Sequence, residues 1–127
     1  MKVLALSYKV CDILQKVYSL LGFTQKAGQL SAGNEAVKAS LSNGKASLLI
    51  ISNDIADNSK KELLNISQKA NIPYIVVGSK YELGLSIGKA HRVAVTINNK
   101  KMAAAILKAF QWTGEIRETM GVVEWPK

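Results

Sequence analysis

Cysteine and histidine are nearly absent from this chain of 127 residues. Each occurs once, as Cys11 and His91. A single cysteine excludes a disulfide framework within the chain and any zinc site that needs several cysteines. So little cysteine is typical of a reducing compartment, and we therefore expect a cytoplasmic protein. Proline is scarce too, and nine glycines do not make a low-complexity chain.

Long apolar runs are missing as well. The longest strongly apolar run, Leu48 to Ile51, has the length of a strand and is far too short to span a bilayer. The first ten residues hold only a few apolar side chains between Lys2 and Lys9, and no small-residue cleavage pattern follows them. We therefore expect a soluble protein that has no signal peptide and does not contact a membrane.

The sequence pattern brings no catalytic groups together. Cys11 and His91 lie far apart in the chain, and no cluster of carboxylates indicates a metal site. The segment from Gly84 to Lys89 resembles a phosphate-binding loop. However, three residues instead of four separate its glycines, and Ala90 stands where serine or threonine is needed. We therefore expect no enzymatic activity, no metal and no cofactor.

An excess of positive charge is the first functional clue. Lysine and arginine total 17 against nine aspartate and glutamate residues, which gives a net charge of +8 and a pI near 9.7. Residues 1–110 carry a net charge of +9, whereas residues 111–127 carry −1. A compact domain this basic is expected to bind a polyanion. The alternative is a basic protein whose lysines are merely solvated.

Hydrophobic periodicity predicts an alternation of helices and strands. Helices are predicted over residues 9–25, 33–43, 59–71, 81–88 and 100–110, an extended segment at 29–32, and strands at 46–52, 74–77 and 92–97. The continuous apolar run at 46–52 indicates a strand that is buried on both faces. The second helix is expected to bury Ala36, Val37 and Leu41, and the third Leu63, Leu64, Ile66 and Ala70. This alternation predicts an α/β fold with a parallel or mixed sheet.

The last residues of the chain depart from this rhythm. Residues 111–127 contain both tryptophans, Trp112 and Trp125, and reverse the charge balance. We therefore expect one domain over residues 1–110 and a C-terminal extension over residues 111–127. The extension could pack on the domain or form contacts of its own.

A polar motif opens the helix predicted at residues 33–43. Asn34 and Lys38 are four residues apart and Glu35 is three before Lys38, so the three side chains gather at the helix start. Backbone N–H groups and the positive end of the helix dipole face outward there. A carboxylate can accept from the N1 and N2 donors of guanine, while an amide and an ammonium can serve its O6 and N7 edge. The alternative is an ordinary polar first turn with a solvated Glu–Lys ion pair.

Several short motifs follow one another over roughly residues 10–110. They are Gly22-Phe-Thr-Gln-Lys-Ala-Gly-Gln-Leu30, Gly33-Asn-Glu-Ala-Val-Lys38, Gly44-Lys-Ala46, Lys60-Lys61, Ile72-Pro73, Ser79-Lys-Tyr-Glu-Leu-Gly84, Ile87-Gly-Lys89 and His91-Arg-Val93. In this order and spacing they resemble the family of kink-turn RNA-binding ribosomal proteins, the L7Ae/L30e superfamily, and its small bacterial members.

The resemblance implies a fold, a ligand and a site. The fold is a three-layer α/β/α sandwich with a four-stranded mixed central sheet. The ligand is a kink-turn, a sharply bent RNA element with tandem sheared G·A pairs, recognised by its shape and a few base edges. Asn34, Glu35 and Lys38 would contact the guanines. Lys80 would hold the RNA backbone, and the loop from Lys89 to Val93 would cover the unpaired nucleotide. The RNA-binding residues implied in this way are Gly33, Asn34, Glu35, Lys38, Lys80, Lys89, His91, Arg92 and Val93.

Two departures from the family pattern concern selectivity for the unpaired nucleotide. Ala56 and Lys60 stand where some eukaryotic members have an acidic and apolar pair. The covering loop, with His91 and Arg92, is more basic than the apolar loop of strong archaeal binders.

The sequence thus predicts a monomeric, non-catalytic protein that binds structured RNA, alongside other ribosomal or ribonucleoprotein components. One alternative is the same fold used mainly as a protein-interaction adaptor with weak or lost RNA binding, which an intact triad of Asn34, Glu35 and Lys38 disfavours. The other is a small-molecule or nucleotide-binding α/β enzyme, which the lack of catalytic groups disfavours.

Overall fold

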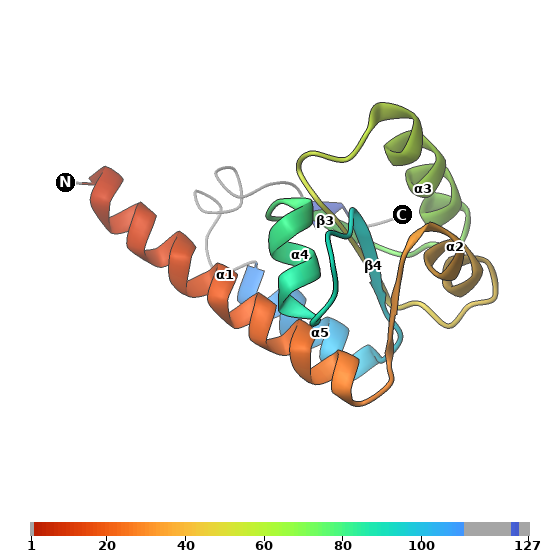
Figure 1. The fold of residues 1–127 in the computed structure, drawn as a ribbon, viewed down its shortest axis with the longest axis horizontal. Helices are drawn as coiled ribbons and strands as arrows, with labels where there is room; N and C mark the ends of the chain where they lie inside the picture. The colour runs from red at the N-terminus through yellow and green to blue at the C-terminus, as the bar shows by residue number, and fades with distance from the viewer. Residues whose placement is uncertain (1, 111–122, 125–127) are drawn as a thin grey trace.

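The computed structural model describes residues 2–110 and 123–124, with side chains over residues 14–109 (Figure 1). Its helices are α1 (Lys2–Lys26), α2 (Asn34–Ser42), α3 (Asp57–Lys69), α4 (Lys80–Ser86) and α5 (Lys100–Phe110). Its strands are β1 (Leu30–Ala32), β2 (Leu48–Ile51), β3 (Tyr74–Val76), β4 (Ala94–Ile97) and β5 (Val123–Glu124). The predicted order of helices and strands is confirmed, and most boundaries agree within about two residues.

The strands form one mixed sheet in the order β1-β4-β2-β3-β5. β2 and β3 run parallel, whereas β4 is antiparallel to both β1 and β2. These four strands are the predicted ones, so the expectation of a mixed central sheet is confirmed. The two-residue strand β5 comes from the C-terminal extension and pairs antiparallel with the outer edge of β3.

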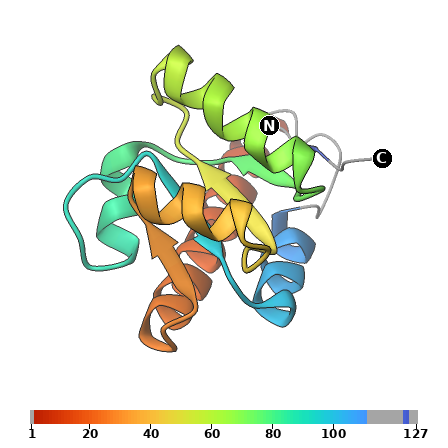
Figure 2. The same ribbon diagram turned by 90° about the vertical axis from the view of Figure 1, so that its right-hand side faces the viewer.

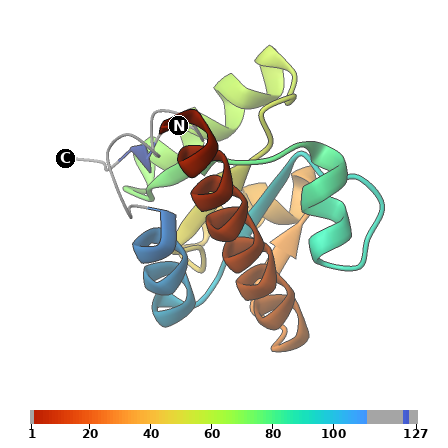
Figure 3. The ribbon, with the colours of Figure 1, turned by 90° about the vertical axis from the view of Figure 1, so that its left-hand side faces the viewer.

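Helices cover both faces of the sheet and produce three layers. Figure 3 shows α1 and α5 side by side in front of the sheet, and Figure 2 shows α2 and α3 on the opposite face. β2 lies between the two cores, because Leu48 and Ile50 belong to the core under α1 and α5, while Leu49 and Ile51 belong to the core under α2 and α3. All four side chains are fully buried, as the apolar run predicts.

The longest helix, α1, begins at Lys2 instead of the expected residue 9, and its first turns extend past the sheet (Figure 1). Its later turns pack on the sheet through the fully buried Val17 and Leu21. The earlier apolar positions, Cys11 among them, lie outside the side chains that the structure describes. Over the described ranges, no helix has both the length and the apolar character needed to cross a bilayer.

Two expected core positions are wrong. Ala36 and Ala70 are exposed, and the neighbouring stripes instead bury Ser40 and Ser67. The hydroxyl of Ser40 lies 2.6 Å from that of Ser31 in β1, and the hydroxyl of Ser67 donates to a carbonyl one turn earlier in α3. Hydrogen bonds inside the protein allow these hydroxyls to be buried, and that compensation is not visible in a hydrophobic pattern.

Candidate nucleic-acid interface

Four loops meet at one edge of the sheet. β1, β2 and β3 end at this edge, and β4 begins there because it runs antiparallel to β1 and β2. The N–H of Ser52 donates to the carbonyl of Val93 over 2.9 Å, and the N–H of Asn53 donates to the carbonyl of Gly78 over 2.8 Å. The starts of α2, α3 and α4 and the loop before β4 therefore form one surface, which we call the loop edge (residues 33–38, 52–57, 78–81 and 89–93).

The first turn of α2 is exposed on the loop edge. Gly33 precedes it with φ 94° and ψ 151°, a conformation that essentially only glycine adopts. A Cβ at this position would meet nothing within 4 Å. Glycine is therefore required here by the backbone conformation and not by a lack of space. Asn34 and Glu35 are exposed in the first turn, where the helix N–H groups carry partial positive charge. The turn therefore presents an amide, a carboxylate and backbone donors.

Lys38 lies one turn further along α2 and is tied to α3. Its Nζ lies 2.7 Å from Oε1 of Glu62. This hydrogen bond, supported by the charges of Glu62 and then Glu35, raises the pKa of Lys38 in spite of partial desolvation. The ion pair between Glu35 and Lys38 that the sequence offered as an alternative is not found among the described residues. The carboxylate of Glu35 is thus left at the tip of α2, while the ammonium of Lys38 is held from the side.

The start of α4 is fixed by hydrogen bonds from two directions. In a capping box, the hydroxyl of Ser79 accepts from the N–H of Glu82 over 3.2 Å, and Oε1 of Glu82 accepts from the N–H of Ser79 over 3.1 Å. The N–H of Lys80 donates to Oδ1 of Asp54 over 3.0 Å. The pKa of Asp54 is lowered, first by the hydroxyl of Ser52 beside it and then by the N–H and the charge of Lys80. Lys80 is therefore held against the loop that follows β2.

Tyr18 of α1 anchors the same helix start from the other side. Its hydroxyl donates to Oε2 of Glu82 over 3.2 Å. Burial raises the pKa of Tyr18, and the carboxylate of Glu82 raises it further, so the hydroxyl stays a protonated donor. Gly78 has φ 69°, and a Cβ there would overlap the hydroxyl of Tyr18. Glycine at this position is required by its conformation, and a Cβ there would also displace the hydroxyl of Tyr18.

Gly84 lets the loop between α4 and β4 lie directly on α4. It is buried, and a Cβ there would overlap the backbone carbonyl of Ala90. The N–H of Lys89 donates to the carbonyl of Gly84 over 2.9 Å, and the N–H of Arg92 donates to the carbonyl of Lys80 over 2.9 Å. The backbone of this loop is therefore tied to both ends of α4.

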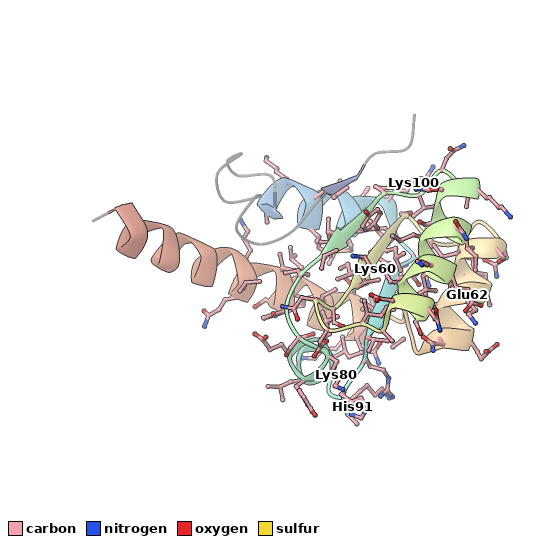
Figure 4. The ribbon with its side chains drawn as sticks, turned by 90° about the horizontal axis from the view of Figure 1, so that it is seen from above. Lys60, Glu62, Lys80, His91 and Lys100 are labelled. Carbon is pink, nitrogen blue, oxygen red and sulfur yellow. The ribbon has the colours of Figure 1, made fainter. Side chains whose placement is uncertain are left out.

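An exposed aromatic pair lies where this loop meets α4. The ring centroids of Tyr81 and His91 are 5.8 Å apart at an interplanar angle of 62°, an edge-to-face contact. The Nζ of Lys80 lies 5.5 Å from the centroid of the Tyr81 ring, and Tyr81 is 65% exposed. Figure 4 shows Lys80 and His91 together at one end of the domain. Ammonium groups beside exposed rings suit phosphates and unstacked bases.

The other loop residues that the resemblance implies differ in their exposure. Lys89 and His91 are exposed. Arg92 is half-buried and donates from Nη1 to the carbonyls of His91, over 2.9 Å, and Ala90, over 3.4 Å. Val93 is half-buried and packs against the core under α2 and α3. The loop edge thus contains all nine residues. Asn34, Glu35, Lys89 and His91 are exposed, whereas Gly33, Lys38, Lys80, Arg92 and Val93 are half-buried.

Three residues of the region are not predicted from the sequence. Tyr81 directly follows Lys80 in the chain, and this adjacency of a cation and an aromatic residue at a helix start could have indicated it. Asp54 and Glu62 become neighbours of α4 and α2 only through folding, and no local pattern reveals those contacts.

The chemical character of the loop edge is that of a binding surface. It offers amide, carboxylate, ammonium and backbone N–H groups together with two exposed rings. Within residues 14–109, no three side chains of His, Cys, Asp or Glu gather closely enough to hold a metal ion.

Comparison with known proteins gives the family. The model of the ribosomal protein L7Ae/L30e/S12e/Gadd45 family matches residues 15–108, and the chain belongs to this family. It is 32% identical over 85 residues to the RNA-binding protein YlxQ of Enterococcus faecium, covering 67% of this chain and 82% of that protein. The corresponding protein of Bacillus subtilis (strain 168) is 29% identical over 90 residues, 71% of this chain and 90% of that protein. The resemblance seen in the sequence motifs is thereby confirmed.

Solved structures support the same fold. A Bacillus halodurans protein of unknown function superimposes with a TM-score of 0.71 at 35% sequence identity, covering 74% of this chain and 95% of that one.

Proposed function

We propose that this protein binds structured RNA of the kink-turn type through its loop edge and performs no catalysis. The observation that carries the proposal is the placement of the first turn of α2, with exposed Asn34 and Glu35, on the same edge as Lys80 and His91. A base-reading group and a phosphate-binding group then face one ligand from two sides. The RNA-binding function named for the YlxQ relatives of Enterococcus faecium and Bacillus subtilis supports the proposal.

Each group has a role in this proposal. The carboxylate of Glu35 accepts from N1 and N2 of a guanine in a sheared G·A pair, and the amide of Asn34 and the ammonium of Lys38 serve the O6 and N7 edge. An ammonium carries three hydrogens, so Lys38 can keep its contact with Glu62 and still donate to a base.

The second side of the loop edge binds the backbone and the unpaired nucleotide. Lys80 and Lys89 neutralise phosphates beside the bend. The loop of residues 89–93 covers the unpaired nucleotide, with the exposed ring of His91 and the neighbouring Tyr81 available for stacking. Val93, packed on the core, keeps the loop in place from below.

We further propose that residues 1–110 are the RNA-binding domain and that the protein acts as a monomer in the cytoplasm. Its partners are ribosomal RNA or another structured RNA and the proteins assembled on it, as the family description of ribosomal proteins suggests. A chain ending at residue 110 is then expected to unfold cooperatively and to bind the same RNA. Loss of cooperative unfolding at room temperature would move the domain boundary into the extension.

The direct test compares two RNAs. One contains a kink-turn with tandem G·A pairs, and the other is identical except that these pairs are replaced by Watson–Crick pairs, which abolish the bend. Titration at one fixed salt concentration is expected to show binding to the kink-turn at least about a hundredfold tighter than to the straight duplex, the span that two or more specific base contacts provide. Equal affinity for both RNAs would leave only non-specific electrostatic binding.

A further inference from the structure

An open groove lies at the opposite end of the sheet from the loop edge. It has a volume of about 500 Å³ and is lined by Ser47, Pro73, Lys100, Ala103, Ala104, Leu107 and Lys108. Ser47 and Pro73 precede β2 and β3, and the other lining residues belong to α5. Figure 4 shows Lys100 on the far side of the domain from Lys80 and His91. The groove is therefore separate from the proposed RNA site.

The floor of the groove is apolar and its ends are cationic. Ala103 and Leu107 are nearly buried, Ala104 is exposed, and the exposed Lys100 and Lys108 lie at its two ends. Such a lining favours a large, flat apolar group that also attracts cations, which is the character of an indole.

The register of β5 brings the end of the chain to this groove. β5 pairs with β3 so that Val123 lies opposite Ile75 and Glu124 lies opposite Tyr74. If this register continues for one residue, position 125 lies opposite Pro73, which lines the groove. Residues directly opposite one another in an antiparallel pair share a face of the sheet. Position 125 is occupied by a tryptophan, whose own placement lies outside the described residues.

A residue at position 125 that pairs with Pro73 would lie on the face of the sheet that α5 covers. Along β3, Ile75 packs in the core under α1 and α5, whereas Tyr74 packs against the core under α2 and α3. Because side chains alternate along a strand, Pro73 shares the face of Ile75, and this is the face that α5 covers. A residue opposite Pro73 is thus directed to the helix that forms the groove floor.

We propose that the groove between α5 and the start of β3 is the docking site for the indole of Trp125, which attaches the C-terminal extension to the domain. The extension then adds a short strand to the exposed edge of β3 and closes the apolar surface of α5. This contact lies within one chain, and it leaves the loop edge open for its own ligand.

The test uses the full chain with Trp112→Phe, so that Trp125 is the one remaining tryptophan. Compared with the same chain unfolded in urea, its fluorescence emission is expected to be blue-shifted and to be quenched less by acrylamide. Ala104→Asp places a carboxylate on the groove floor and is expected to move the emission toward the unfolded value. Ala39→Asp is the matched control, because Ala39 is an exposed helical alanine on α2, across the sheet.

Three outcomes would overturn the proposal. Emission equal to that of the unfolded chain would mean that Trp125 does not dock. An equal response to Ala104→Asp and Ala39→Asp, or no response to either, would place Trp125 elsewhere. A blue shift that disappears on dilution would show that the extension of a second copy fills the groove instead. Circular dichroism of Ala104→Asp and Ala39→Asp establishes that each variant is folded before its fluorescence is compared.

Discussion

The ammonium of Lys38 and the carboxylate of Glu62 lie 2.7 Å apart, and this contact joins α2 to α3 at the loop edge. Lys38 is therefore held by a neighbouring helix. The carboxylate of Glu35, in the same turn of α2 as Asn34, forms no salt bridge among the described residues, although its charge contributes to the raised pKa of Lys38. A carboxylate left unpaired on a basic surface repels phosphate. A carboxylate at the tip of α2 is consistent with RNA binding if it accepts hydrogen bonds from donors on a base.

The two partners of this ion pair are expected to affect RNA binding differently when each is removed. Lys38→Gln removes a cation that serves a guanine and should weaken kink-turn binding roughly tenfold. Glu62→Gln removes a competing anion and should leave binding equal or tighter, most clearly at low salt, where charges are least screened. Titrations of both variants at two salt concentrations check this. If Glu62→Gln weakens binding as much as Lys38→Gln, the pair acts as one positioning unit.

Affinity for RNA is expected to fall steeply with salt. With about four to six phosphate contacts, the slope of log affinity against log salt should be roughly −3 to −5. Lys80→Gln should reduce the magnitude of this slope by about one. Lys69→Gln is the control, because Lys69 lies in the last turn of α3, away from the loop edge. An unchanged slope for Lys80→Gln would remove Lys80 from the set of phosphate contacts.

Gly84→Ala is expected to loosen the loop that covers the unpaired nucleotide. The added methyl group would overlap the carbonyl of Ala90, and relieving that overlap should cost about 1–3 kcal/mol of folding free energy. RNA affinity should fall as well, because the loop moves away from α4. Leu85→Ala, at a neighbouring position that is 80% exposed, should change stability by less than about 0.5 kcal/mol. Urea unfolding and RNA titration of both variants make the comparison, and equal stability of the two would contradict the close contact.

Local sequence pattern was sufficient for most of the fold. The fully buried run in β2 and the helical repeat of Val17 and Leu21 each predict an element and its buried face, because both depend on spacing within one segment. The three layers of the sandwich came from the resemblance to a family, whereas the order of the strands in the sheet was not predicted from the sequence. Ser40 and Ser67 show where pattern is insufficient, since a buried hydroxyl depends on a partner.

The candidate site divides in the same way. The motif of Asn34 and Glu35 is local and could be placed at a helix start from the sequence. The contacts of Lys38 with Glu62 and of Lys80 with Asp54 join residues 24 and 26 positions apart, which no local spacing reveals. The pairing of β5 with β3 likewise joins a two-residue strand to an edge about fifty positions away in the chain, and two residues are too few for a periodic signal.

Recognition of guanine by Glu35 is tested by the binding of a kink-turn RNA to the Glu35→Gln variant, with Glu62→Gln as the matched control. Both substitutions remove one negative charge near α2, so a purely electrostatic account predicts equal or tighter binding for both. Base recognition predicts that Glu35→Gln alone weakens kink-turn binding, by about 1–3 kcal/mol, because an amide supplies one acceptor where two are needed. Neither variant should bind straight duplex RNA less tightly than the parent does, since no base is read there. If Glu35→Gln binds the kink-turn as tightly as the parent, the first turn of α2 is only a polar helix start, and the proposed recognition of guanine is wrong.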